Sequence, residues 1–244
     1  NPSALIYDLL NCYSGQLSLG SDGKHVVVAC DSKTQVEALE KLIKAKIKGA
    51  IILTIHSGNS SQGLQSEFAK EAKNYLSLYD GDSPIIVIFS PALGTGTSIE
   101  ADRIERVFGI FSGQSISDSD MLQMLARVRC NAPRSVWTAE SGTAYSLLGR
   151  SSSPTKIKEA LSSQTCAIAN STRGGLTEGL YSGLVGFDYD SDPTINMFCQ
   201  IVAEKNAAMP NLRSQVLMRL EKEGNKIVSR NQFENEETKK AMIK

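Results

Sequence analysis

From residue 25 onward, short apolar runs alternate with longer amphipathic stretches. Five runs have the length and β-branched content of buried strands: "HVVVAC" (25–30), "GAIILTIHS" (49–57), "IIVIFS" (85–90), "IERVFGIF" (104–111) and "RSVWTA" (134–139). Between them, apolar residues recur at helical spacing over about 33–47, 64–79 and 117–129. This alternation predicts an α/β fold with a mostly parallel sheet and helices on both faces.

The pattern changes near residue 150, where "GRSSSP" is a Ser-rich break and no strong strand run follows. Asp192 is placed to cap a helix with Pro193 at its first position, and a second amphipathic stretch ends at Gly224. We therefore expect one domain over residues 1–150 and a mainly helical extension over 151–244. The chain opens on Asn1 rather than Met, so we also expect a piece of a longer protein.

Composition narrows the functional classes. The 244 residues carry 26 basic and 26 acidic side chains, so any contact with nucleic acid has to come from a local patch. No apolar run is long enough to span a membrane and no signal-peptide layout is present, which predicts a soluble protein without a membrane partner. Five scattered cysteines without a C-x-x-C pair favour the cytoplasm over a disulfide framework, and they indicate no metal site.

The loop after the third strand run, "SPALGTGTSIE" (90–100), is rich in glycine. Ligands of parallel sheets sit at the carboxyl ends of strands, where glycines let backbone N–H groups approach phosphates. Two nucleotide fingerprints fail, because Ile99 stands where a dinucleotide loop needs its third glycine and no GK[ST] of a Walker loop occurs. A tight turn without function is the alternative.

A second candidate lies in "DMLQMLARVRC" (120–130), where Gln123, Arg127 and Arg129 share a short helical stretch. Arginine suits the stabilisation of a transferring phosphoryl group, since its planar fork binds phosphate oxygens and keeps its proton. A solvated helix face with two basic residues is the alternative.

Together these segments resemble a known family. "SPALGTGTSIE" followed by "QMLARVR" resembles motifs V and VI of superfamily 2 helicases, and "VVVACDSKTQVEALEKLI" resembles the motif IV strand and helix of their second RecA-like domain. The resemblance covers roughly residues 20–140. It is nearest to plasmid replication proteins of the cyanobacterial type, and more remotely to the herpesvirus origin-binding helicase.

The resemblance implies roles for individual residues. Gly96 matches the motif V glycine, and Gln123 and Arg127 match the opening glutamine and first arginine of motif VI. The second arginine departs from the family spacing, because Arg129 is six residues after Gln123 and Cys130 takes the seventh place. Catalytic roles are implied for Arg127, Arg129 and Gln123, nucleotide contacts for Gly96, Ser98 and Glu100, and nucleic-acid contacts for Ser32, Ser90, Gly94 and Thr95.

The family binds ATP and Mg²⁺ in a cleft between two RecA-like domains, and its first domain supplies the Walker lysine and the Mg²⁺-binding acid. The resemblance thus implies the C-terminal motor domain of an ATP-dependent DNA helicase in a replication-initiation protein. Its partners would be single-stranded DNA and a preceding RecA-like domain, without which it would be inactive. The alternative is a stand-alone α/β enzyme or binding module that holds a small phosphorylated ligand at residues 94–98.

Overall fold

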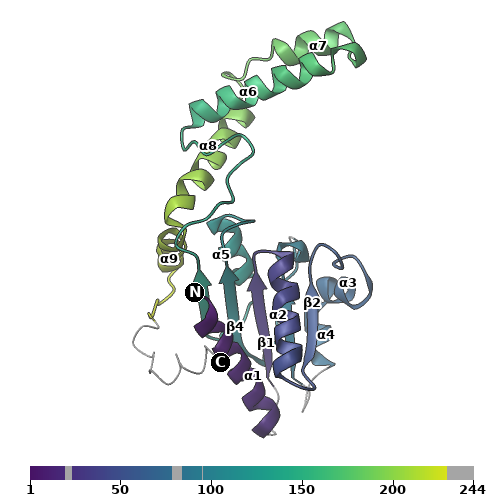
Figure 1. Cartoon of the computed structure of the whole chain (residues 1–244), viewed down its shortest axis with the longest axis vertical. Helices are drawn as coiled ribbons and strands as arrows, with labels where there is room; N and C mark the ends of the chain where they lie inside the picture. The colour runs from purple at the N-terminus through teal and green to yellow at the C-terminus, as the bar shows by residue number, and fades with distance from the viewer. Residues whose placement is uncertain (20–23, 79–83, 95, 230–244) are drawn as a thin grey trace. The chain divides into compact units, whose positions relative to one another are not determined.

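The computed structural model describes residues 1–19, 24–78, 84–94 and 96–229, and its centre is one five-stranded sheet. The strand order is β2-β3-β1-β4-β5 and every neighbouring pair is parallel (Figure 1). The strands are β1 (His25–Cys30), β2 (Ile51–Ile55), β3 (Ile85–Phe89), β4 (Ile104–Phe111) and β5 (Arg134–Thr138). The predicted α/β class with a parallel sheet is therefore confirmed.

Helices connect the strands and continue after them. In the first part of the chain they are α1 (Ser3–Leu19), α2 (Lys33–Lys46), α3 (Gly63–Lys70), α4 (Ala72–Ser77) and α5 (Asp118–Ala126). After β5 come α6 (Pro154–Ser171), α7 (Glu178–Val185), α8 (Pro193–Ala208) and α9 (Leu212–Lys222). Short 3₁₀ turns lie at Pro91–Leu93, Arg173–Gly175 and Met209–Asn211.

Alternate side chains of the sheet point into two layers. Val26 and Val28 of β1 join a buried cluster with Leu9 of α1 and Val36 and Ile43 of α2, so these two helices cover one face (Figure 1). Burial of this kind stabilises by about 25 cal/mol per Å² of apolar surface removed from water.

The opposite layer explains a glycine in the middle of β4. A Cβ on Gly109 would lie 2.8 Å from the ring of Phe111 and 3.1 Å from Leu125 of α5. The close approach of α5 to the sheet therefore requires a residue without a side chain at this position.

The observed elements differ from the predicted ones in three places. The stretch predicted as one helix over about 64–79 forms α3 and α4, which are separated at Glu71 with φ −142° and ψ 63°. Apolar spacing cannot detect such a break, because Phe68, Ala72 and Tyr75 share a face in either case. The helix predicted over 117–129 ends at Ala126, and α1 was not predicted at all, although Leu5, Leu9 and Tyr13 recur at helical spacing and are buried.

The chain forms two compact units. The first contains residues 1–140 and the chain from Leu212 onward, and the second contains Ser141–Asn211. The second unit is therefore an insertion between β5 and α9, a division different from the expected 1–150 and 151–244. Arg213 explains the return to the first unit, since its Nε donates to the carbonyl oxygen of Thr138 at 2.8 Å and its Nη1 lies 3.3 Å from Glu140.

The second unit, Ser141–Asn211, has a small core of its own. Its buried cluster consists of Ile157, Cys199, Val202 and Ala203, with Leu148 and Ile195 packed beside it. Asn206 is 1% exposed and its Nδ2 donates to the carbonyl oxygens of Gly149 and Ser151 at 2.9 and 2.8 Å. The predicted start of α8 is confirmed, because the Asp192 side chain accepts hydrogen bonds from the N–H groups of Thr194 and Ile195.

Two observations bear on the environment of the protein. Across the described ranges, no helix combines the length and the apolar character that crossing a membrane would require. All five cysteines are free thiols, and Cys30 and Cys199 are buried.

Candidate functional site

The loop between β3 and β4 runs from one edge of the sheet to the other. At its start, the N–H of Ser90 donates to the carbonyl oxygen of Ile55, at the carboxyl end of β2. At its end, the carbonyl oxygen of Arg103 accepts from the N–H of His25, at the amino end of β1. One loop therefore links the edge where parallel sheets bind ligands to the opposite edge.

The middle of this loop is hydrogen bonded to the segment that follows α5. The N–H of Ile99 donates to the carbonyl oxygen of Arg127 at 2.8 Å, and the N–H of Arg129 donates to the carbonyl oxygen of Ile99 at 2.9 Å. Ile99 and Val128 form a parallel bridge and are both fully buried. The two sequence segments with the candidate residues are thus held side by side.

Three predicted residues meet at this junction. Ser98 Oγ donates to Glu100 Oε1 at 2.8 Å, and Arg129 Nη1 lies 3.4 Å from the same oxygen. The side chains of Arg129 and Glu100 are 68% and 50% exposed, so their ion pair adds only about 0–1 kcal/mol to stability. Arg129 can therefore exchange this partner for another anion at little cost.

Arg127 is less exposed than Arg129, and among the described residues its side chain makes fewer polar contacts. It is the half-buried residue that ends α5, and its Nε and Nη1 are buried without a hydrogen-bond partner in the described part of the chain. Burial lowers the pKa of the Arg127 guanidinium, which nevertheless stays protonated at neutral pH. Burying a donor without an acceptor costs about 1–3 kcal/mol of free energy, and more when the donor is charged. An anion that accepts hydrogen bonds from Arg127 would therefore recover this free energy.

Helix α5 is well anchored at its start. Ser117 and Asp120 form a reciprocal capping box, in which Ser117 Oγ accepts from the Asp120 N–H and Asp120 Oδ2 accepts from the Ser117 N–H. Asp118 is 1% exposed, and its Oδ2 lies 2.7 Å from Arg219 Nε of α9, a close charge contact without a well-aligned hydrogen bond. Gln123 is exposed on this helix, four residues before Arg127.

The glycines of the loop are required by backbone conformation rather than by crowding. Gly94 and Gly96 have φ of +81° and +99°, and an added Cβ would meet no atom within 4 Å at either position. Thr97, which was not predicted, fixes the loop because its Oγ1 donates to the carbonyl oxygens of Ala69 and Leu93 at 3.0 and 3.2 Å. Thr95, a predicted nucleic-acid contact, lies outside the described residues.

The two remaining residues predicted to contact nucleic acid, Ser32 and Ser90, lie at the carboxyl ends of the β-strands. Ser32 caps α2, where its Oγ accepts from the N–H of Gln35 at 3.2 Å. Ser90 is 3% exposed, and its Oγ accepts from the N–H of Ala92. A contact between Ser90 and a bound strand would need this hydroxyl to become accessible.

A buried carboxylate that was not among the predicted site residues joins the ends of β1 and β4. Asp31 is 1% exposed and accepts hydrogen bonds from the Gly113 N–H at 2.7 Å and the Ser112 Oγ at 2.9 Å. The chain leaves β1 through α2 toward β2 on one side of the sheet, and it leaves β4 through α5 toward β5 on the other side. The boundary between β1 and β4 is therefore the topological switch point of the sheet. Only the strand order reveals this contact, because 81 residues separate Asp31 from Ser112.

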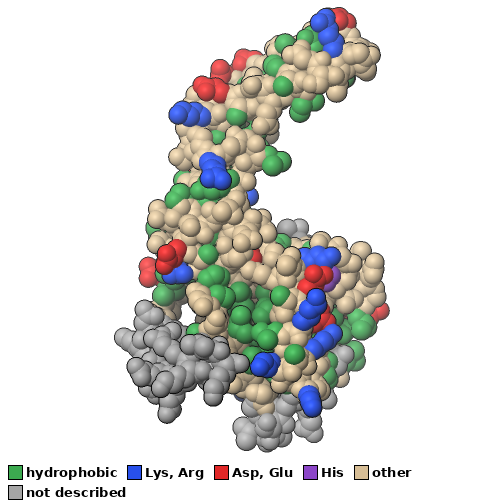
Figure 2. Space-filling model, viewed as in Figure 1, with side chains coloured by type: hydrophobic (Ala, Val, Ile, Leu, Met, Phe, Trp, Pro, Cys, Tyr) green, Lys and Arg blue, Asp and Glu red, His purple; other side chains and the backbone are tan. Residues whose placement is uncertain are grey.

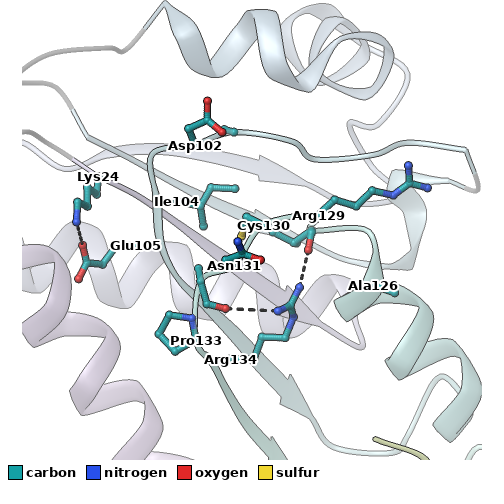
Figure 3. A pocket seen from close by; sticks show the side chains of 13 residues that line it. Lys24, Asp102, Ile104, Glu105, Ala126, Arg129, Cys130, Asn131, Pro133 and Arg134 are labelled. Carbon is teal, nitrogen blue, oxygen red and sulfur yellow. Dashed lines mark hydrogen bonds and ion pairs between the residues drawn. The ribbon is translucent and has the colours of Figure 1, made fainter. Parts of the chain in front are cut away.

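A cavity of about 770 Å³ opens at the amino ends of β4 and β5, beside the arginine segment (Figure 3). Lys24 is paired with Glu105 at 3.3 Å, and Arg134 donates through Nη2 to the carbonyl oxygen of Val128 at 2.7 Å. Figure 3 shows the Arg129 side chain extending away from the centre of this cavity. Because these cations already have partners in the protein, the cavity alone does not define an anion site.

Among the described residues, no group of three His, Cys, Asp or Glu side chains is placed to hold a metal ion. Comparison of the chain with models of known protein families gives no match, and comparison with curated proteins gives none either.

Proposed function

We propose that this chain is the second RecA-like domain of a superfamily 2 ATP-dependent DNA helicase, the C-terminal motor part of a replication-initiation protein. Two features support the proposal. The segments that resemble motifs V and VI are hydrogen bonded to each other through Ile99, and the helix before Arg127 packs on a parallel α/β sheet.

The observation that carries the proposal is the state of Arg127. Its Nε and Nη1 are buried without partners in the described part of the chain, next to the exposed and weakly paired Arg129. A guanidinium in this state suits the phosphate oxygens of a ligand presented by another domain, because charge-assisted hydrogen bonds are strong in a partly desolvated site.

In the intact protein, a preceding RecA-like domain would hold ATP and Mg²⁺, and this chain would close on them. ATP supplies the phosphoryl group whose transfer drives the motor. Arg127 and Arg129 would bind the phosphate oxygens and offset the charge that develops during transfer. Gln123 lies on α5, four residues before Arg127. Ser98 and Glu100 would connect this site to the loop through the existing contact of Glu100 with Arg129.

The single strand of DNA would follow the carboxyl edge of the sheet. Ser32 and the glycine-rich turn at Gly94 lie there, and backbone N–H groups and hydroxyls are common partners of nucleic-acid phosphates. Since the loop from Ser90 to Arg103 spans both edges, it is suited to relay strand binding to the arginines. We assign the protein to the cytoplasm, where its free thiols would persist.

The test is ATP hydrolysis by the full-length gene product, with and without single-stranded DNA. Arg127→Ala and Arg129→Ala are compared with Arg173→Ala, an exposed arginine of the second unit that stacks on Tyr181. We expect DNA-stimulated hydrolysis that Arg173→Ala leaves unchanged and that at least one of the other two variants abolishes. Stimulated hydrolysis that survives both site variants would contradict the proposal.

The alternative, a small phosphorylated ligand held at residues 94–98 by this chain alone, has one observation in its favour. The space above Gly96 is open, so its backbone is accessible to a ligand. Nucleotide binding to the isolated 244-residue chain distinguishes the two functions. Tight binding that Gly96→Ala removes would favour the alternative, whereas the motor proposal expects weak binding or none.

A further inference from the structure

The backbone that carries Arg127 and Arg129 lies at the end of α5, where the last carbonyl groups of a helix have no partner inside the helix. Two polar groups of this backbone are bonded to Ile99. The Ile99 N–H donates to the carbonyl oxygen of Arg127, and the Arg129 N–H donates to the carbonyl oxygen of Ile99. Val128 lies between the two arginines and is fully buried, so its own carbonyl oxygen needs a donor from another part of the chain.

Arg134 supplies this donor. Its Nη2 donates to the carbonyl oxygen of Val128 at 2.7 Å, and its Nη1 donates to the carbonyl oxygen of Ala132 at 3.4 Å (Figure 3). The backbone of Arg134 is itself fixed, because this residue begins β5 and pairs with Val107 of β4. The guanidinium of Arg134 therefore ties the end of the arginine segment to the sheet.

The peptide unit between Val128 and Arg129 is thus held at both of its polar groups. Arg134 binds its C=O, and Ile99 binds its N–H. Because a peptide unit is planar, fixing both groups fixes its orientation and the direction in which Arg129 leaves the backbone. Arg127 lies on the other side of Val128, so the same bonds set the spacing of the two candidate guanidinium groups.

We infer that Arg134 is a positioning residue for phosphoryl transfer, which holds the backbone at Val128 so that Arg127 and Arg129 meet the phosphate oxygens. This inference rests on the proposed function. Arg134 acts through the two arginines rather than on the ligand, because both of its terminal nitrogens donate to main-chain carbonyl groups. A displacement of a catalytic group by about 1 Å can lower a rate about 10²-fold, so the loss of this bond should be visible in the rate.

The test is single-turnover hydrolysis of ATP by the full-length gene product with single-stranded DNA, with ATP affinity measured separately. Arg213→Ala is the matched control for Arg134→Ala, because Arg213 Nε also donates to a main-chain carbonyl, that of Thr138 at 2.8 Å, at the other end of β5. We expect Arg134→Ala to lower the rate about 10- to 100-fold at an unchanged ATP affinity. Arg213→Ala should change neither quantity.

Two further variants of Arg134 separate its role from a general effect on folding. Arg134→Lys keeps a cationic donor on a long side chain and should recover most of the lost rate. Arg134→Gln shortens the side chain, should show the same loss as Arg134→Ala, and replaces it in the comparison if Arg134→Ala does not fold. Hydrogen exchange without ATP locates the effect, because the amides of Ile99 and Arg129 should exchange faster in Arg134→Ala and not in Arg213→Ala.

The outcomes separate this inference from the proposed function. If Arg127→Ala or Arg129→Ala abolishes stimulated hydrolysis and Arg134→Ala keeps the parent rate, the inference is overturned and the proposed function stands. A lower ATP affinity in Arg134→Ala would also overturn it, since Arg134 would then bind the nucleotide directly. An equal rate loss in Arg213→Ala would show a general effect on the fold. A parent protein without stimulated hydrolysis would contradict the proposed function and this inference together.

Discussion

The contact of Asp118 with Arg219 gives the sharpest stability prediction, because it joins α5, the helix that Arg127 ends, to α9. Asp118 is 1% exposed and Arg219 is 40% exposed. Breaking a fully buried ion pair by removing one partner costs about 3–5 kcal/mol, whereas an exposed pair is worth about 0–1 kcal/mol. One buried and one half-exposed partner place Arg219→Ala between these limits, at about 2 kcal/mol of unfolding free energy. Most of this loss comes from the carboxylate left buried without a cation.

The assay is urea unfolding followed by circular dichroism, with the dependence on urea concentration compared between variants. Lys222→Ala, at an exposed position of the same helix, is the control and should change stability by less than about 0.5 kcal/mol. In a double-mutant cycle, Asp118→Asn should recover about 1 kcal/mol or more in the Arg219→Ala background, because it removes the unpaired charge. If Arg219→Ala is as stable as Lys222→Ala, the carboxylate is not held by Arg219 and the reasoning is refuted.

Two further predictions concern the sheet. Gly109→Ala should destabilise the folded protein by about 1–3 kcal/mol, because its Cβ would lie 2.8 Å from the Phe111 ring and 3.1 Å from Leu125. Thermal unfolding measures this change, and an unchanged melting temperature would contradict the close packing at Gly109. Cys30 is fully buried, and burial raises the pKa of its thiol above the ordinary 9.0, so the unfolded chain loses this proton first and stability falls as pH rises above about 9. Urea titrations at several pH values between about 9 and 11 give the decrease of the unfolding free energy per pH unit. This decrease should be smaller by about 1.4 kcal/mol in Cys30→Ala than in the parent, and an equal decrease would show that the thiol does not contribute.

Local sequence patterns predicted the parallel sheet because its central strands β1 and β3 are buried on both faces. The runs at 25–30 and 104–111 coincide with β1 and β4, and Asp192 caps α8 as expected. The insertion of the second unit was not predicted, since it depends on the contacts of Arg213 with Thr138 and Glu140, which lie more than 70 residues away in the chain. Long-range contacts of single polar side chains leave no periodic trace in a sequence.

The candidate site was likewise predictable only in part from the sequence. The resemblance to helicase motifs supplied the candidate residues, and the structure brings three of them, Ser98, Glu100 and Arg129, into contact. It could not predict that Arg127 is half-buried with unpaired N–H groups, because this depends on how α5 ends against the loop. The hydrogen bonds of Asp31 and Thr97 were missed for the same reason, since each joins segments that are distant in sequence.

The most direct test of the central claim is single-turnover hydrolysis of bound ATP by the full-length protein, comparing Arg127→Ala with the parent while ATP binding is measured separately. An arginine that stabilises phosphoryl transfer is worth about 10³–10⁵ in rate. The account predicts a loss of this size with ATP binding largely retained, because Arg127 would act on the charge that develops during transfer. Hydrolysis at the parent rate would show that the unpaired guanidinium of Arg127 has no part in catalysis, and the same rate in Arg129→Ala as well would contradict the account as a whole.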